Sequence, residues 1–291
     1  MAFNTIAVIG TGQMGAGIAQ ACAGVAAHVI AIDPDHAQRE RAKVGIAKSL
    51  AKLAEKGIIH DPAKIEARIK FAAHTDDAEP ADLVIEAVVE DLGVKRALWE
   101  ELDVLCRPDT VFASNTSSLS IHEQAEVTDR ADRFLGLHFF NPVPLMTLVE
   151  VVKTDLLDPA IFERGIALVR ALGKTPVVAR DTPGFVVNRL LVPYLLEAAR
   201  AVESGVAGVV DIDAGMKLGA GHPMGPLMLL DFVGIDTVVR IAGIFHATSG
   251  DERHRAPAIL TRMAKEGRMG KKSGMGFYDW TGVEPVVRPL Q

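Results

Sequence analysis

Polar side chains capable of acid–base chemistry follow two apolar, strand-like runs of this 291-residue chain. NTSS (115–118) follows the run VFAS, and HFFNP (138–142) follows the run FLGL. Glu150 lies further on in the apolar stretch TLVEVV, where an unpaired carboxylate would be unfavourable. An imidazole that is hydrogen-bonded to a buried carboxylate has a fixed tautomer and a stabilised cation, which suits a general base. The plainer interpretation is that His138 is a satisfied core histidine and Glu150 a structural carboxylate.

A glycine motif near the start predicts a second chemical site. GTGQMG (10–15) follows a strand pattern and opens a helix pattern, the context in which such a motif binds a dinucleotide. Gly10 permits a tight turn, Gly12 lets the backbone approach a pyrophosphate, and Gly15 allows close packing of helix and strand. Asp33 ends the next strand pattern, where its carboxylate can bind both ribose hydroxyls and repel a 2′-phosphate, which favours NAD over NADP. The predicted cofactor site comprises Gly10, Gly12, Gln13, Met14, Gly15 and Asp33.

The composition excludes several other classes of protein. A net charge of −6 argues against binding to nucleic acid or an anionic membrane, and 5% aromatic residues are few for a base-stacking surface. Cys22 and Cys106 have neither disulfide-like nor zinc-like spacing, so we expect no metal site. The first residues lack a secretory pattern, and charged or polar residues interrupt the most apolar stretches. We therefore expect a cytoplasmic protein without a membrane span.

The first part of the chain alternates strand and helix patterns. The strand patterns, which include IAVIG and LVIEAV, lack polar alternation, as is typical of a parallel sheet covered by helices on both faces. We therefore predict an α/β fold with an N-terminal Rossmann-like, mostly parallel sheet. The expected strands are residues 5–10, 28–33, 82–87, 111–114 and 134–138, and the expected helices are 15–26, 38–56, 93–106 and 121–126.

The second part of the chain has helical patterns and few strand signals. The breaker Thr182-Pro183-Gly184 suggests a boundary, which gives domains 1–182 and 183–291. The wide apolar faces of this all-helical domain favour burial by a second copy of the chain, so we expect a homodimer. The expected helices are residues 186–204, 210–218, 226–248 and 257–266, and the tail 283–291 is expected to be irregular.

Six motifs in order carry a family resemblance over nearly the whole chain. They are GTGQMGAGIAQ, VIEAVVEDLGVK, SNTSSLSI, GLHFFNPVPLMTLVEVV, DTPGFVVNRLLVPYL and GMKLGAGHPMGPLMLLDFVGID. The chain resembles the 3-hydroxyacyl-CoA dehydrogenase family in its short stand-alone form, similar to bacterial 3-hydroxybutyryl-CoA dehydrogenases. The resemblance implies an NAD-dependent enzyme that interconverts (3S)-3-hydroxyacyl-CoA thioesters, of short chain length, and their 3-oxo forms. It also implies dimerisation through the helical domain.

The resemblance also implies roles for particular residues. His138 would be the catalytic base, Glu150 its charge partner, and Ser117 and Asn188 would contact the substrate. It implies that the NAD site is lined by Glu90, Lys95, Asn115, Ser117, Asn141 and Lys272. Lys271 adjoins Lys272 in a flexible basic turn, and either lysine could cover the cofactor. On sequence alone, Glu90 and Lys95 would pass for a solvated loop pair.

A lysine stripe offers a site for coenzyme A phosphates. Lys48, Lys52 and Lys56 fall on one helix face, and the resemblance points to Ser49 and Lys56. A solvated helix face is the plainer interpretation.

Two further functions stay open for the chain as a whole. One is an NAD-dependent dehydrogenase of a free hydroxy or sugar acid, like gulonate dehydrogenases, and the other is a non-catalytic NAD-binding protein.

Overall fold

The chain forms two compact units, Met1–Phe185 and Val186–Gln291. The computed structural model describes residues 3–288. The division falls three residues after the boundary expected from the sequence, because the segment after the last strand packs with the first unit as far as Phe185. Over residues 3–288, no helix has both the length and the apolar character needed to cross a bilayer.

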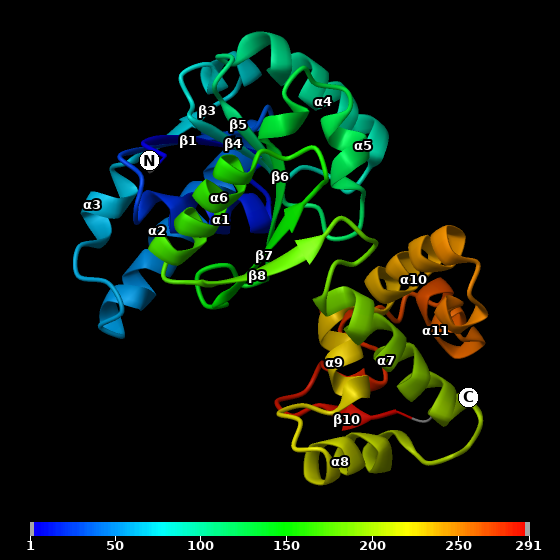
Figure 1. Ribbon diagram of the computed structural model, residues 1–291. Coiled ribbons are helices and arrows are strands. Elements are labelled where there is room, and N and C mark those ends of the chain that lie inside the picture. The colour runs from blue at the N-terminus through cyan, green and yellow to red at the C-terminus, as the bar shows by residue number, and fades with distance from the viewer. Residues whose placement is uncertain (1–2, 289–291) are drawn as a thin grey trace. The chain divides into compact units, whose positions relative to one another are not determined.

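The first unit is built on one eight-stranded sheet with the order β3-β2-β1-β4-β5-β6-β7-β8 (Figure 1). Neighbouring strands are parallel except for β6 and β7, which are antiparallel. The predicted mostly parallel, Rossmann-like sheet is therefore confirmed. The strands are β1 (Thr5–Ile9), β2 (His28–Ile32), β3 (Ile69–Ala72), β4 (Leu83–Glu86), β5 (Val111–Ser114), β6 (Phe134–Phe139), β7 (Leu148–Lys153) and β8 (Thr175–Arg180).

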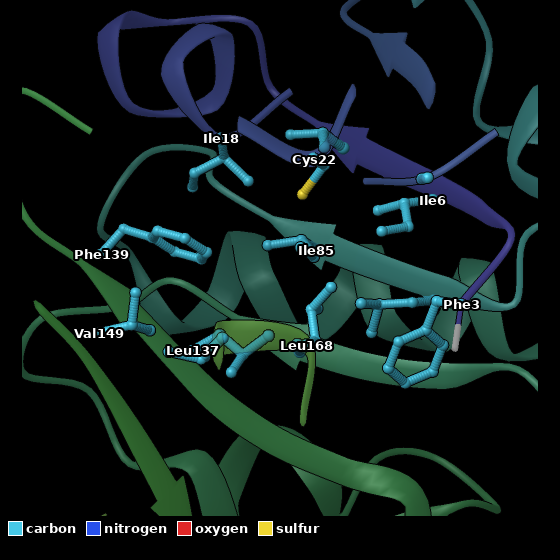
Figure 2. Close-up of a cluster of buried hydrophobic side chains, with 14 of the residues drawn as sticks. Phe3, Ile6, Ile18, Cys22, Ile85, Leu137, Phe139, Val149 and Leu168 are labelled. Carbon is cyan, nitrogen blue, oxygen red and sulfur yellow. The ribbon is translucent and has the colours of Figure 1, made fainter. Parts of the chain in front are cut away.

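Helices cover both faces of this sheet because its strands are apolar on both sides. The helices of the unit are α1 (Gln13–Ala23), α2 (His36–Glu55), α3 (Pro62–Glu66), α4 (Leu92–Leu105), α5 (Ile121–Ala125) and α6 (Pro159–Ala171). On one face, Ile18 and Cys22 of α1 point toward Ile85 of β4, and Leu168 of α6 joins the same cluster (Figure 2). On the other face, Trp99 of α4 packs on the rings of Phe112 and Phe134.

Five strands and α-helices of the first unit lie where the sequence patterns predict none: β3, α3, β7, α6 and β8. The strand β3 is at the sheet edge and its residues are only partly buried, so it lacks the continuous apolar run of the central strands. The strand β8 is the opposite edge and is largely exposed. The strand β7 carries the charged Glu150 in its centre. The edge strands β3 and β8 therefore lack the apolar pattern of a buried strand, and in β7 the buried charge interrupts that pattern.

The second unit is mainly helical, as predicted, with two corrections. Its helices are α7 (Val187–Glu203), α8 (Val209–Gly219), α9 (Pro226–Val233), α10 (Ile235–Ser249) and α11 (Ala258–Lys265). The single helix expected over 226–248 is wrong, because Gly234 at φ +100° separates α9 from α10. The expected irregular tail is also wrong, because β10 (Val286–Val287) pairs with β9 (Tyr278–Asp279). Residues 289–291 of that tail lie outside the described residues.

Two buried carboxylates hold the second unit together. Asp213 accepts hydrogen bonds from the backbone N–H groups of Leu227 and Met228 at the start of α9, and from the Tyr278 hydroxyl. Asp231 accepts from the N–H groups of Phe277 and Tyr278 and from the Trp280 indole. Because buried donors need acceptors, these contacts anchor the C-terminal segment on the helices.

Candidate active site

Most of the predicted site residues of the first unit follow the carboxyl ends of the central strands of the sheet. The chain leaves β1 for β2 on one side, whereas β4 pairs with β1 on the other, so the strand order reverses between β1 and β4. Ligands of open α/β sheets bind at such a switch point, outside the carboxyl ends of the strands. At this end of the sheet, β2 leads into Asp33 and β1 leads into Gly10. The strand β4 leads into the segment after Glu86, β5 into Asn115, and β6 into the residues after His138.

The glycine loop has the close approaches that its sequence predicts. Gly10 has φ +89°, and a Cβ atom there would lie 2.7 Å from the carbonyl oxygen of Ala87. At Gly15 a Cβ atom would lie 1.8 Å from the carbonyl oxygen of Gly10, so any side chain would separate the helix from the loop. At Gly12 a Cβ atom would meet only the Gln38 amide at 3.7 Å, which leaves this side of the loop open.

The first turn of α1 is suited to an anion. It contains no acidic residue, and no side chain caps it, so its N–H groups and partial positive charge remain available. Gln13 is exposed at the first helical position and Met14 packs on the core. Asp33 accepts hydrogen bonds from the N–H and hydroxyl groups of Thr11 at 2.8 and 3.2 Å, which holds its carboxylate beside the loop. These residues fit a dinucleotide with its pyrophosphate over the loop and its ribose at Asp33.

His138 and Glu150 face each other across the β6–β7 ladder. They are directly paired in the antiparallel register, and His138 Nδ1 lies 2.6 Å from Glu150 Oε2. The Glu150 side chain is 0% exposed and that of His138 is 8% exposed. Because Nδ1 faces the carboxylate, Nε2 is the nitrogen that can exchange a proton with a bound molecule. The pair can accept a proton and share the resulting positive charge.

Aromatic rings enclose the imidazole. The Phe140 ring centroid is 4.5 Å from that of His138, and the Phe185 ring centroid is 5.7 Å away. Phe185 is the one non-glycine residue with positive φ in the described part of the chain, at +50°, and it is buried. A bulky residue holds this backbone conformation only where its surroundings stabilise it, and such residues cluster at functional sites. Phe140 and Phe185 reduce the access of water to the imidazole.

The segment after β5 is connected to the neighbouring strand ends. The Asn115 side-chain oxygen accepts from the N–H of Phe139 at 2.8 Å, which ties the end of β5 to the residue after His138. The N–H and hydroxyl groups of Ser117 lie 2.9 and 3.2 Å from Glu90 Oε1. Thr116 and Ser118 also donate hydroxyl hydrogen bonds to Glu90. The Ser117 hydroxyl is therefore held by a carboxylate that follows β4.

Glu90 and Lys95 belong to a buried charge cluster rather than to a solvated loop. The Lys95 side chain is 1% exposed and its ammonium group contacts the carboxylate of Glu86, which is 0% exposed. Lys95 Nζ also lies 3.4 Å from Glu90 Oε2. Burial raises the pKa of Glu90, but the Lys95 charge and the hydrogen bonds from Thr116 and Ser117 outweigh it, so its pKa is below the ordinary value.

A groove of about 310 Å³ runs between α1, α2 and the segment after β6. Gly12, Gln13, Ser49 and Asn141 line it, so the glycine loop, the lysine-bearing helix and the segment after the imidazole share one surface. Lys56 is the exposed residue at the C-terminal cap of α2 and is not among the lining residues.

Two predicted site residues belong to the helical unit. Asn188 is the second residue of α7, three residues after Phe185 in the chain. Lys272 lies in the 3₁₀ turn Lys271–Ser273, and its ammonium group is 2.6 Å from the Asp236 carboxylate. The neighbouring Lys271 ammonium lies over the Phe232 ring, 4.2 Å from its centroid. The two lysines therefore have different partners within their own unit.

Several residues of the edge were missed from the sequence. Glu86 ends the apolar strand LVIE, and a charge at that position is the signal that could have found it. Ser114 donates to Glu86 at 2.7 Å from the end of β5, but a serine at a strand end is too common to stand out. Phe185 was concealed because its backbone conformation and its contact with His138 arise only in the folded chain.

The lowered pKa of Glu90 predicts an acid dependence of stability. Ionised Glu90 stabilises the folded chain above its ordinary pKa of 4.5, and this contribution is lost as the pH falls through the lower pKa of the folded state. The Glu90→Gln variant should be less stable at neutral pH and should lose less free energy of unfolding on acidification. Urea titrations from neutral pH to about pH 3 measure both quantities. Exposed Glu100→Gln on α4 controls for the amide substitution, and equal acid slopes for wild type and Glu90→Gln would contradict the assignment.

The chain is similar to known proteins over nearly its whole length. Residues 5–182 match the family described as 3-hydroxyacyl-CoA dehydrogenase, NAD binding domain, and residues 184–280 match its C-terminal domain. The human mitochondrial hydroxyacyl-coenzyme A dehydrogenase is 46% identical over 94% of this chain and 90% of its own length. A probable 3-hydroxybutyryl-CoA dehydrogenase of Bacillus subtilis is 43% identical over 96% of this chain and 98% of its own. The crystal structure of (S)-3-hydroxybutyryl-CoA dehydrogenase PaaH1 from Ralstonia eutropha matches with a TM-score of 0.93 and 39% identity, over 97% of this chain and all of that one. The chain therefore belongs to the 3-hydroxyacyl-CoA dehydrogenase family, whose members are NAD-dependent oxidoreductases.

Proposed function

We propose that the protein interconverts (3S)-3-hydroxyacyl-CoA thioesters of short chain length, such as 3-hydroxybutyryl-CoA, and their 3-oxo forms. The observation that carries the proposal is the 2.6 Å contact between His138 and Glu150 at the sheet edge that also holds the glycine loop. The names of the bacterial relatives support the short acyl chain.

In the oxidation direction, His138 acts as the general base. Its Nε2 removes the proton of the 3-hydroxyl group, and Glu150 stabilises the imidazolium through Nδ1. A bound NAD would supply the acceptor for the hydride that leaves C3 of the substrate. Ser117 is the proposed contact of the reacting oxygen, and its hydroxyl would exchange the Glu90 carboxylate for the substrate when the substrate binds. Phe140 and Phe185 limit the access of water to the imidazole.

The remaining predicted residues position the cofactor and the substrate. The proposed NAD contacts are Gly10, Gly12, Gln13, Met14, Gly15, Asp33, Glu90, Lys95, Asn115, Ser117, Asn141 and Lys272. We assign the coenzyme A phosphates to Ser49 and Lys56, which is supported by the groove that Ser49 lines and by the exposed lysines of α2. Asn188 would hold the acyl group.

The proposed reaction is tested by reduction of acetoacetyl-CoA with NADH, followed as the loss of cofactor absorbance. We expect kcat/KM at least ~10²-fold above that for free acetoacetate, because a site built for CoA uses binding energy that the free acid lacks. NADPH in parallel should be the poorer cofactor, since Asp33 repels a 2′-phosphate. Efficient turnover of free hydroxy or sugar acids would instead show a gulonate-dehydrogenase-like enzyme. Binding of NADH without any turnover would show a non-catalytic protein.

The role of the pair is tested by substitution of each partner. His138→Ala should lower kcat at least ~10²-fold with little change in the Kd of NADH, because it removes the proton acceptor and not the cofactor cradle. Glu150→Gln keeps a hydrogen-bond acceptor but removes the charge, so kcat should fall less steeply. His74→Ala, an exposed histidine of the same unit, is the control. Near-wild-type turnover by His138→Ala would sink the mechanism.

We also propose that the helical unit associates with a second copy of the chain. Its large apolar side chains Leu190, Val206 and Leu218 are 71, 75 and 86% exposed in the single chain, and a second copy would remove them from water.

Sedimentation velocity at micromolar concentration should therefore give twice the mass of one chain. Val206→Glu combined with Leu218→Glu should shift the protein toward monomer, because each substitution would place a charge in the buried interface. Val104→Glu, at an equally exposed valine of the first unit, should not change the mass. A monomer for the wild type would refute the proposal.

A further inference from the structure

We propose that the buried cluster of Glu86, Lys95 and Glu90 raises the affinity of the protein for the oxidised cofactor relative to the reduced one, and that Glu86 contributes to this effect without touching the cofactor. The inference rests on the proposed function, because it concerns the dinucleotide that Asp33 and the glycine loop would hold. It assigns a role to Glu86, a residue that the proposed mechanism does not use.

The side chain of Glu86 is buried and surrounded by hydrogen-bond donors. It ends β4 and is 0% exposed. Its Oε1 accepts from the N–H of Val88 at 2.7 Å and contacts the Lys95 ammonium group, while its Oε2 accepts from the Ser114 hydroxyl at 2.7 Å. Donors therefore surround both oxygens, an arrangement that a buried carboxylate requires.

The cluster carries one more negative than positive charge. Lys95 supplies the single ammonium group, which lies between the carboxylates of Glu86 and Glu90. The hydrogen bonds and the Lys95 charge that lower the pKa of Glu90 keep this second carboxylate ionised at neutral pH. Because the Glu86 and Lys95 side chains are 0 and 1% exposed, solvent ions screen the cluster weakly, unlike the nearby exposed Asp91.

The order of the strands places this charge under the nicotinamide half of the dinucleotide. Asp33 follows β2, the glycine loop follows β1, and His138 lies at the end of β6. A dinucleotide that reaches from Asp33 to the base must pass over the ends of β4 and β5, where Glu86 and its donor Ser114 lie. The nicotinamide ring is cationic when oxidised and neutral when reduced. A net negative charge beneath it therefore stabilises the oxidised form selectively.

The test is a pair of binding measurements that need no turnover. The Kd of NADH is obtained from its fluorescence and the Kd of NAD⁺ from competition, for wild type and for variants shown by near-ultraviolet circular dichroism to be folded. Glu86→Gln removes one negative charge in the same shape, so the ratio of the NAD⁺ Kd to the NADH Kd should rise about tenfold. Lys95→Met removes the positive charge, so this ratio should fall by about the same factor.

Three features of the design separate charge from packing. The two substitutions move the ratio in opposite directions, whereas loosened packing would move both the same way. Glu86→Asp keeps the charge and should keep the wild-type ratio within about twofold, and Glu100→Gln makes the same chemical change on the exposed face of α4 and should do likewise. If Glu86→Gln does not fold, Lys95→Met alone decides.

The outcomes also separate this inference from the proposed function. A wild type that binds neither NADH nor NAD⁺ overturns the proposed function. A wild type that binds both, with a ratio that Glu86→Gln and Lys95→Met leave within twofold or shift in the same direction, overturns the charge effect and leaves the proposed function standing.

Discussion

A carboxylate that is buried in the sheet needs a hydrogen-bond partner, and for Glu150 this partner is the His138 ring. Glu150 is 0% exposed, and the antiparallel register of β6 and β7 places His138 directly opposite it. Directly opposed residues of an antiparallel pair project from the same face, so the two side chains meet without any loop to position them. Between β6 and β7, and nowhere else in the eight-stranded sheet, neighbouring strands are antiparallel. The antiparallel pairing of β6 and β7 thus places the carboxylate directly beside the imidazole.

The same constraint operates at the neighbouring strand ends. Glu86 and Lys95 are both buried, and removing either partner would leave an uncompensated charge in the interior. Their contact connects β4 to the first turn of α4, and Glu90 extends it to the segment after β5 through Thr116, Ser117 and Ser118. At the ends of these elements, charged contacts therefore add to the apolar packing that Trp99 and Phe112 provide between α4 and β5. Such contacts are directional, which apolar packing is not, and they suit a surface that must orient a hydroxyl group.

Local features of the site could be predicted from the sequence, and features made by distant contacts could not. The loop of Gly10, Gly12 and Gly15 depends on residues that are adjacent in the chain, so the motif alone indicated both the turn and the helix that follows. The burial of Lys95 depends on Glu86 and on the neighbouring strand, and the pattern VVEDLGVK gives no sign of it. The strand β7 was missed because its buried charge disrupts the apolar pattern, although the same charge forms the contact with His138. Gly234 lay inside an apolar helical pattern, and only the folded chain shows its positive φ.

Phe185 connects the base to the second unit through the chain itself. Gly184 and Phe185 both have positive φ, at +77° and +50°, so the chain reverses sharply after β8. Glycine adopts this conformation readily, whereas for phenylalanine it is unfavourable by about 1–3 kcal/mol. Burial of the ring beside the imidazole offsets that cost, since burying a phenylalanine side chain contributes about 1.5–3 kcal/mol. Asn188 follows three residues later on the first turn of α7. The residue proposed to hold the acyl group thus follows, by three positions in the chain, the ring that packs on the proposed proton acceptor.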